Sequence, residues 1–340
     1  MGDKMTKSMK NYTSKNLMYF FNMFIFSISF ANSCYMSILM NNEIKYSWLI
    51  PLALIIPYLI LIFFIKKNYQ EYENIKKKLI TKLLLFSYSI LSITLLIYYS
   101  SIILTNWFYE ESSLFLFIVL FGFLILSLGL FATNTILRIG FIWSIVYAII
   151  ALMGLSIHNE SNIMFLFPIE LKTSTFLNNI FFLIIPLDNI IYLLFDTNHS
   201  PQRKTLLLSG ILTLIFCTIQ LIINLTLVNY RFYEDLETPA IEVFFMYFSK
   251  NHIGHYDVVL IINVLMTLFY KGVFYSNLTL ELFPKDKRKY FIPFIALTII
   301  PLAILLVFNK DLKYYYSYII LGILFFIYII IIVFQRSKSS

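Results

Sequence analysis

The stretch VVLIINVLMTLFYKGVFYSNLTL, residues 258–280, decides the fold class. It is predominantly apolar and carries a single charge, Lys271. A helical run of about 20 apolar residues, rising about 1.5 Å per residue, crosses a hydrocarbon core of roughly 30 Å. The stretch therefore predicts a membrane-spanning helix that holds a lysine deep within the bilayer.

The composition extends this prediction to the whole chain. Of its 340 residues, 60% are hydrophobic, 19% aromatic and 13% charged, which leaves too little polar surface to cover a soluble globule. Similar apolar runs recur, and we predict ten spans, at 17–40, 46–65, 83–104, 114–132, 139–157, 176–195, 205–229, 256–280, 290–308 and 314–334. They are expected to be helices, since the polar–apolar alternation of barrel strands is missing.

These runs leave no room for a soluble domain. We predict one polytopic membrane domain over 1–340, with a basic tail at 1–16, a ten-helix bundle at 17–334 and a short tail at 335–340. Most of the 26 Lys and Arg residues fall in alternate loops together with both termini, so both termini are expected on the cytoplasmic side. The net charge of +8 follows these loops rather than one exposed face, which argues against nucleic acid.

Polar residues form a stripe along the 258–280 run. Asn263, Thr267, Lys271 and Tyr275 recur every four residues and share one helical face. A charge at a helix centre costs about 2.5–3.5 kcal/mol, so it should face protein or water and have a partner. Three interpretations stay open for Lys271: snorkelling to the interface, pairing with a fixed acid, or lining a cavity.

The sixth predicted span holds the second charge. In IIPLDNII, residues 184–191, Pro186 removes a helix hydrogen bond just before Asp188 and Asn189. If the ten spans are two inverted sets of five, span 1 corresponds to span 6, and span 1 has its own polar residues at Asn22 and Ser27. We expect a 5+5 inverted-repeat, transporter-like fold with broken helices 1 and 6. A proline kink without any ligand is the alternative.

No enzyme signature accompanies these features. Walker, dinucleotide-binding and nucleophile-elbow motifs do not occur, and the histidines show no metal-ligand spacing. Cys34 and Cys217 both lie in apolar runs, where a thiol behaves as a small hydrophobe. We expect no catalysis, no metal and no cofactor.

The order of features resembles the B subunit of spore germinant receptors, the endospore germination permease family of the amino acid–polyamine–organocation superfamily. The segments that carry the resemblance are NTILRIGFIWSIVY (134–147), FLFPIE (165–170), FFLIIPLDNIIYLLF (181–195), ETPAIEVFF (237–245) and HYDVVLIINVLMTLFYKGVFYS (255–276). Asn134 stands where the family usually has a glutamate.

The resemblance implies a subunit in the inner membrane of a dormant spore, working with an A-type membrane subunit and a C-type lipoprotein. Such a subunit binds a small polar nutrient, commonly an amino acid, and helps to trigger ion release. The expected ligand-binding residues are Lys271, Asp188, Asn189, Thr267, Asn263, Pro186, Asn22 and Ser27. The expected structural or gating residues are Arg138, Asn134, Pro239 and Asp257. The alternatives are an ion-coupled amino acid transporter and a purely structural assembly subunit.

Overall fold

The computed structural model describes residues 16–29, 31, 48–64, 79–107, 113–155, 180–192, 203–227, 256–283 and 288–308. Within these ranges all regular structure is helical and no strand occurs, so the predicted all-α fold class is confirmed. The first helix is Asn16–Ser29. The labelled elements are α3 (Leu49–Phe64), α5 (Leu79–Trp107), α6 (Leu114–Leu128), α7 (Thr133–Leu155), η3 (Ile180–Leu183), α9 (Ile184–Leu187), η4 (Asp188–Ile191), α11 (Arg203–Leu227), α13 (Tyr256–Glu281) and α14 (Arg288–Phe308).

Four of these helices are long and apolar enough to cross a membrane. They cover Leu79–Asn106, Thr133–Ile150, Arg203–Thr226 and Val258–Glu281, and they match the predicted spans at 83–104, 139–157, 205–229 and 256–280. Four shorter apolar helices, Asn16–Ser29, Leu49–Phe63, Leu114–Leu128 and Ile295–Leu306, lie within other predicted spans. The predicted tenth span, 314–334, lies outside the described residues.

The helices expose apolar side chains and bury small polar ones. On α6, for example, Leu116 and Phe123 are both 60% exposed. On α5, Ser92 and Ser101 are buried, and their hydroxyls donate to carbonyls one turn back, at Tyr88 and Ile97. An apolar exterior around small interior residues suits a lipid environment, where close packing rather than water exclusion holds helices together.

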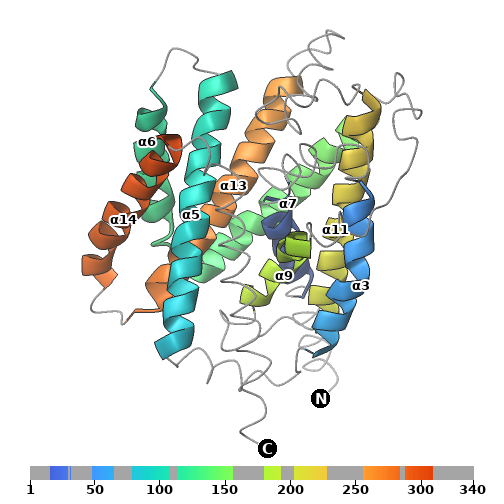
Figure 1. Ribbon diagram of the computed structural model, residues 1–340, viewed down its shortest axis with the longest axis horizontal. Helices are drawn as coiled ribbons and strands as arrows, with labels where there is room; N and C mark the ends of the chain where they lie inside the picture. The colour runs from blue at the N-terminus through green and yellow to red at the C-terminus, as the bar shows by residue number, and fades with distance from the viewer. Residues whose placement is uncertain are drawn as a thin grey trace, which may run out of the picture.

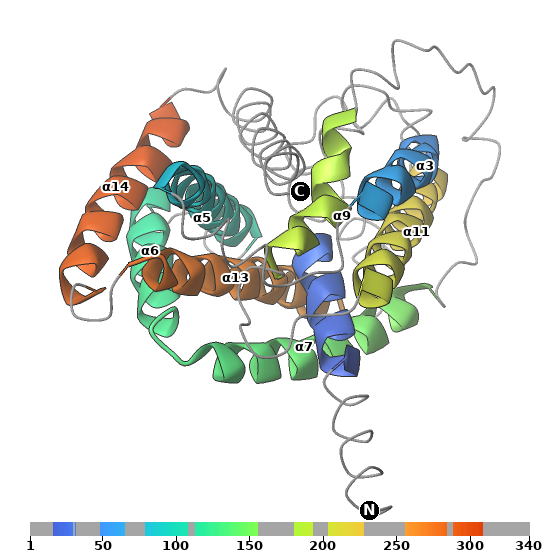
Figure 2. The same ribbon diagram turned by 90° about the horizontal axis from the view of Figure 1, so that it is seen from below.

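Most of the helices fall into two groups (Figure 1). We call α5, α6, α13 and α14 the four-helix group, because every pair among them is in contact. The helix Asn16–Ser29, α3, α11 and the 180–192 segment form the second group, in which α11 packs on both α3 and α9. Figure 2 shows α7 running below both groups. It contacts α13 and supplies the Leu137 carbonyl to Asn22.

One glycine allows α7 to pass this closely. A Cβ atom at Gly140 would overlap the Asn22 side chain and the ring of Tyr270. Only glycine leaves this space, and it therefore fixes the depth at which α7 packs.

Helix α7 begins earlier than the sequence predicted. It starts at Thr133 rather than 139, and Arg138 consequently lies within the helix, with its side chain exposed. The start is fixed from α13, whose Asn277 amide donates to the carbonyls of Gly129 and Phe131 in the preceding turn. This cross-helix anchoring has no local sequence signal, which explains the misplaced boundary.

In the predicted sixth span the regular α-helix is interrupted over residues 180–192, but by 3₁₀ turns. The chain stays helical, as η3, α9 and η4 follow one another without an unwound residue. Pro186 cannot donate the i→i−4 bond, and the chain accommodates it with 3₁₀ turns on both sides. In the predicted span 1 the helix is regular past Asn22 and Ser27 to Ser29, and most of the span beyond it lies outside the described ranges.

Candidate functional site: a buried ion pair between two helix groups

The two charges predicted within the apolar runs meet. The Lys271 ammonium on α13 lies 2.5 Å from Asp188 Oδ2, and both side chains are 0% exposed. Complete burial excludes snorkelling as the explanation for Lys271. Each charge would be costly alone, and pairing removes most of that cost.

Two tyrosine hydroxyls complete the shell around the carboxylate. Tyr88 on α5 donates to Asp188 Oδ1 at 2.6 Å, and Tyr275 on α13 donates to the same oxygen at 2.5 Å. The two hydroxyl oxygens are themselves 3.3 Å apart. Both hydroxyls therefore satisfy one carboxylate oxygen of Asp188, while Lys271 contacts the other.

The lysine has a second set of contacts, on the helix Asn16–Ser29. Its ammonium donates to the Phe26 carbonyl at 2.9 Å and lies 4.3 Å from the centre of the Phe26 ring. This carbonyl is close to the C-terminal end of the helix, where the macrodipole favours a cation. The aromatic face adds a cation–π attraction, which is larger when the pair is desolvated.

A second polar cluster lies nearby on the same helices. Asn22 Nδ2 donates to the carbonyls of Met18 (2.7 Å) and Leu137 (2.9 Å), while Asn22 Oδ1 accepts from Tyr270 Oη at 2.5 Å. Tyr192 Oη lies 3.2 Å from Tyr270 Oη and 3.4 Å from the Asn22 carbonyl oxygen, to which it donates. Asn22 therefore ties its helix to α7, α13 and the 180–192 segment.

The other predicted ligand-binding residues are buried but lie outside these contacts. Thr267 donates back to the Val264 carbonyl of its own helix. Asn263 Oδ1, Ser27 Oγ and both polar atoms of Asn189 are buried without a hydrogen-bond partner. Such orphans are rare, because an unsatisfied buried polar group costs about 1–3 kcal/mol. Pro186 is buried within α9.

Two of the predicted gating residues are described, and neither contacts the ion pair. Asn134 and Arg138 are exposed on the first turns of α7. The side chain of Asp257 and the whole of Pro239 fall outside what the structure describes.

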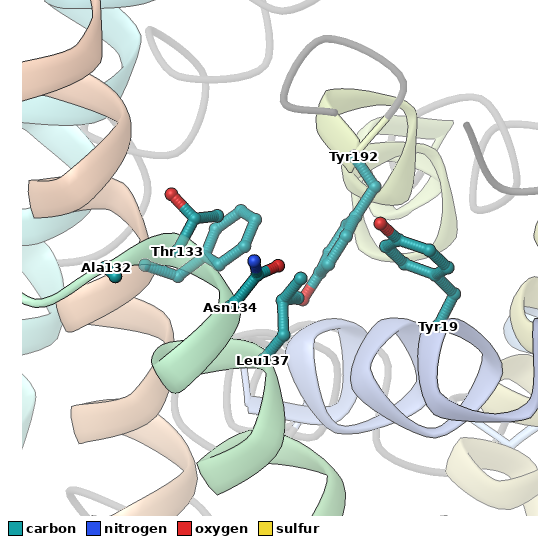
Figure 3. Close-up of a pocket in the computed structure, with 7 residues that line it drawn as sticks. Tyr19, Ala132, Thr133, Asn134, Leu137 and Tyr192 are labelled. Atoms are coloured by element: carbon teal, nitrogen blue, oxygen red, sulfur yellow. The ribbon is translucent and has the colours of Figure 1, made fainter. Parts of the chain in front are cut away.

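A cavity lies beside the second cluster. It has a volume of about 210 Å³ and is lined by Tyr19, Ala132, Thr133, Asn134, Leu137, Tyr192 and Phe274 (Figure 3). Of the predicted site residues whose side chains the structure describes, only Asn134 reaches it. The cavity is separate from the ion pair, since neither Asp188 nor Lys271 belongs to its lining.

Sequence reasoning missed the aromatic part of the site. Tyr88, Tyr192 and Tyr270 lie inside apolar runs, where the sequence does not distinguish tyrosine from other large hydrophobic residues. A phenol in the middle of a span needs a hydrogen-bond partner, so the positions of these three tyrosines within the spans could have indicated a polar site. Phe26 acts through its backbone carbonyl, which no side-chain pattern could reveal.

The described residues thus define an all-helical protein with membrane-length helices and a buried charge cluster where its helix groups meet. Among them, no group of three or more His, Cys, Asp or Glu could hold a metal ion. No protein-family model and no curated protein matches the chain.

Proposed function

We propose that the chain is the nutrient-sensing subunit of a spore germinant receptor. In this proposal a small polar nutrient, such as an amino acid, binds at the midplane where the helix groups meet, and binding triggers ion release. The observation that carries it is the Asp188–Lys271 pair, which links the two groups with no exposed surface. Charged groups inside membrane helices are expensive and are therefore functional candidates by default.

A sensor needs an element with two arrangements of similar free energy. The 180–192 segment is suited to this role, because it alternates between 3₁₀ and α winding and carries Asp188. Mid-helix 3₁₀ turns often mark a hinge. A ligand that satisfies the orphaned Asn189 amide, or that separates Asp188 from Lys271, would favour a second position of this segment.

The pattern of contacts supports a ten-helix, inverted-repeat architecture. When the predicted spans are numbered from the N-terminus, the second packs on the seventh (α3 on α11), the third on the eighth (α5 on α13) and the fourth on the ninth (α6 on α14). The first and sixth meet through the Phe26 and Tyr192 rings, whose centroids are 5.2 Å apart. A two-fold axis that exchanges two sets of five spans relates each helix to its partner five positions later.

The same proposal places the chain in the spore inner membrane with both termini cytoplasmic. The A-type membrane subunit and the C-type lipoprotein would be its partners. Lys271 would act as a built-in cation, holding Asp188 and the end of the first helix together without an external ion.

The test uses spores that carry Lys271→Ala, and separately the double variant Asp188→Asn with Lys271→Met, at normal protein level. Because the double variant leaves no unpaired charge, it should keep the fold while losing the switch. We expect both kinds of spore to lose the nutrient response and to germinate normally with a stimulus that bypasses receptors. An unchanged nutrient response in both would remove the ion pair from the mechanism.

An ion-coupled amino acid transporter is the second candidate, favoured by the internal pairing of helices five positions apart. It predicts accumulation of labelled amino acid in vesicles under an ion gradient, with loss in the double variant. A receptor predicts ligand binding without accumulation. For a purely assembly role, the variants would change the abundance of the complex and nothing else.

A further inference from the structure

We propose that the cavity at the start of α7 is a second ligand site, for a small, uncharged, planar molecule that offers a hydrogen-bond donor beside an acceptor. A primary carboxamide on an aromatic ring and a neutral heteroaromatic ring are the two chemical forms of this class. The site is distinct from the midplane site of the proposed function, and the inference does not depend on the latter.

The size of the cavity sets the scale of the ligand. About 210 Å³ holds roughly seven water molecules at ~30 Å³ each, which corresponds to one aromatic ring with a small substituent. A peptide or a lipid chain could place only one end in this space. The ligand would contact four separate elements. Tyr19, Asn134 and Tyr192 come from the first helix, α7 and the end of the 180–192 segment (Figure 3), and Phe274 comes from α13.

The walls favour a flat ring. Tyr192 and Phe274 stack on one another with centroids 4.5 Å apart and planes inclined by 26°. Hydrogen bonds from Tyr192 Oη to the second polar cluster hold this pair in place. Tyr19 contributes another ring to the lining. Preformed aromatic surfaces bind planar molecules at low entropic cost.

Asn134 supplies an amide to the described lining of the cavity. Its side chain is exposed and makes no hydrogen bond to the described residues, and its amide offers both donors and an acceptor. The hydroxyl of Thr133 already bonds to Asn277 and Glu281, and that of Tyr192 bonds to the second polar cluster. The best-matched ligand therefore carries a hydrogen-bond donor beside an acceptor, so that both pair with the Asn134 amide.

Charge argues for a neutral ligand. No lining side chain among the described residues carries a formal charge, and Lys271 and Asp188 are paired with each other behind the aromatic wall. The N-terminus of α7 would by itself attract an anion. Glu281, whose Oε1 accepts from Thr133 at 2.7 Å, already supplies a negative charge at that helix end.

The cavity wall also connects to the ion pair. Phe26 contacts both Tyr192 and Phe274, with centroids 5.2 and 5.0 Å away, and its ring lies under the Lys271 ammonium. A ligand that holds Tyr192 in place would therefore favour the observed position of the 180–192 segment.

The experiment uses the full chain in lipid nanodiscs and three probes of one shape: benzamide, benzoate and benzamidinium. Binding is measured by ligand-observed NMR, with empty nanodiscs subtracted. We expect benzamide to bind at least about tenfold more tightly than either ion. Asn134→Leu should weaken benzamide at least about tenfold, and Asn134→Asp should shift the preference to benzamidinium.

Thr135→Asp is the matched control, because Thr135 is exposed on the same helical turn but does not line the cavity. It places the same charge one residue away and should leave the order of the three probes unchanged. The proposal is overturned if benzoate binds as tightly as benzamide, if Thr135→Asp acts like Asn134→Asp, or if benzamide shows no binding up to millimolar concentration. None of these outcomes bears on the Lys271 tests.

Discussion

At the scale of single residues, Asp188 and Lys271 form a unit whose members cannot be removed singly without cost. Lys271→Met leaves a buried carboxylate, and Asp188→Asn leaves a buried ammonium. Breaking one side of a buried pair typically costs about 3–5 kcal/mol, whereas replacing both charges is often neutral. We therefore expect the double variant to be more stable than either single variant, as measured by thermal unfolding in one detergent. Additive destabilisation would mean that the two charges are not coupled in the folded protein.

The tyrosine hydroxyls around Asp188 give a second prediction at this scale. Tyr275→Phe removes a hydrogen bond to a buried carboxylate, and such bonds contribute about 1.5–3 kcal/mol. Tyr58→Phe is the control, since Tyr58 Oη donates to the neutral Leu206 carbonyl at 2.6 Å and that class of bond contributes about 0.5–1.5 kcal/mol. Denaturant titration of both variants should rank Tyr275→Phe as the more destabilised. Equal losses would contradict a larger contribution from the hydrogen bond to the Asp188 carboxylate.

At the scale of elements, the packing of α7 depends on Gly140. Gly140→Ala places a methyl group against the Asn22 side chain and the Tyr270 ring, both held by the second polar cluster. Overpacking of this kind costs about 1–3 kcal/mol. Gly122→Ala is the matched control, because its methyl group comes no closer than 3.2 Å to Ile300 and 3.8 Å to Ile97, both apolar side chains. We expect a clearly lower midpoint of thermal unfolding for Gly140→Ala than for Gly122→Ala.

The elements could be predicted where local sequence determines their ends, and could not where a distant residue does. The apolar runs gave the positions of the membrane-length helices, because chain length and hydrophobicity are local properties. The start of α7 was missed, since Asn277, far away in the sequence, defines the preceding turn. The form of the 180–192 segment was missed as well, because a proline and an aspartate fit both an unwound helix and a 3₁₀ one.

At the scale of the whole molecule, the sequence indicated which residues were unusual but not which of them meet. Lys271 and Asp188 both stood out, and pairing with a fixed acid was one of three open interpretations. Their contact needs α13 and the 180–192 segment to face each other, which follows from the packing of all the helices. The cavity beside Tyr192 was not predicted at all, because it lies between four elements and its lining side chains carry no charge.

The pairing of helices five positions apart predicts a specific cross-link between α6 and α14. A Cβ atom at Gly122 would lie 3.2 Å from Cγ1 of Ile300, so cysteines at these two positions are within disulfide reach. We expect Gly122→Cys with Ile300→Cys to cross-link in native membranes under mild oxidation, in a chain whose Cys34 and Cys217 are replaced by serine. A mass shift after cleavage between the two helices detects the bond.

Phe123→Cys with Ile300→Cys is the control for this cross-link. Phe123 is the next residue on α6, but it is 60% exposed and turns about 100° away from α14. A cross-link confined to the first pair supports contact between the fourth and ninth predicted spans in the membrane. Equal cross-linking of both pairs would indicate that α6 rotates freely, and no cross-link in either pair would contradict the packing of the four-helix group. Because that group presents α5 and α13 to Asp188, its loss would also remove the basis for the ion pair.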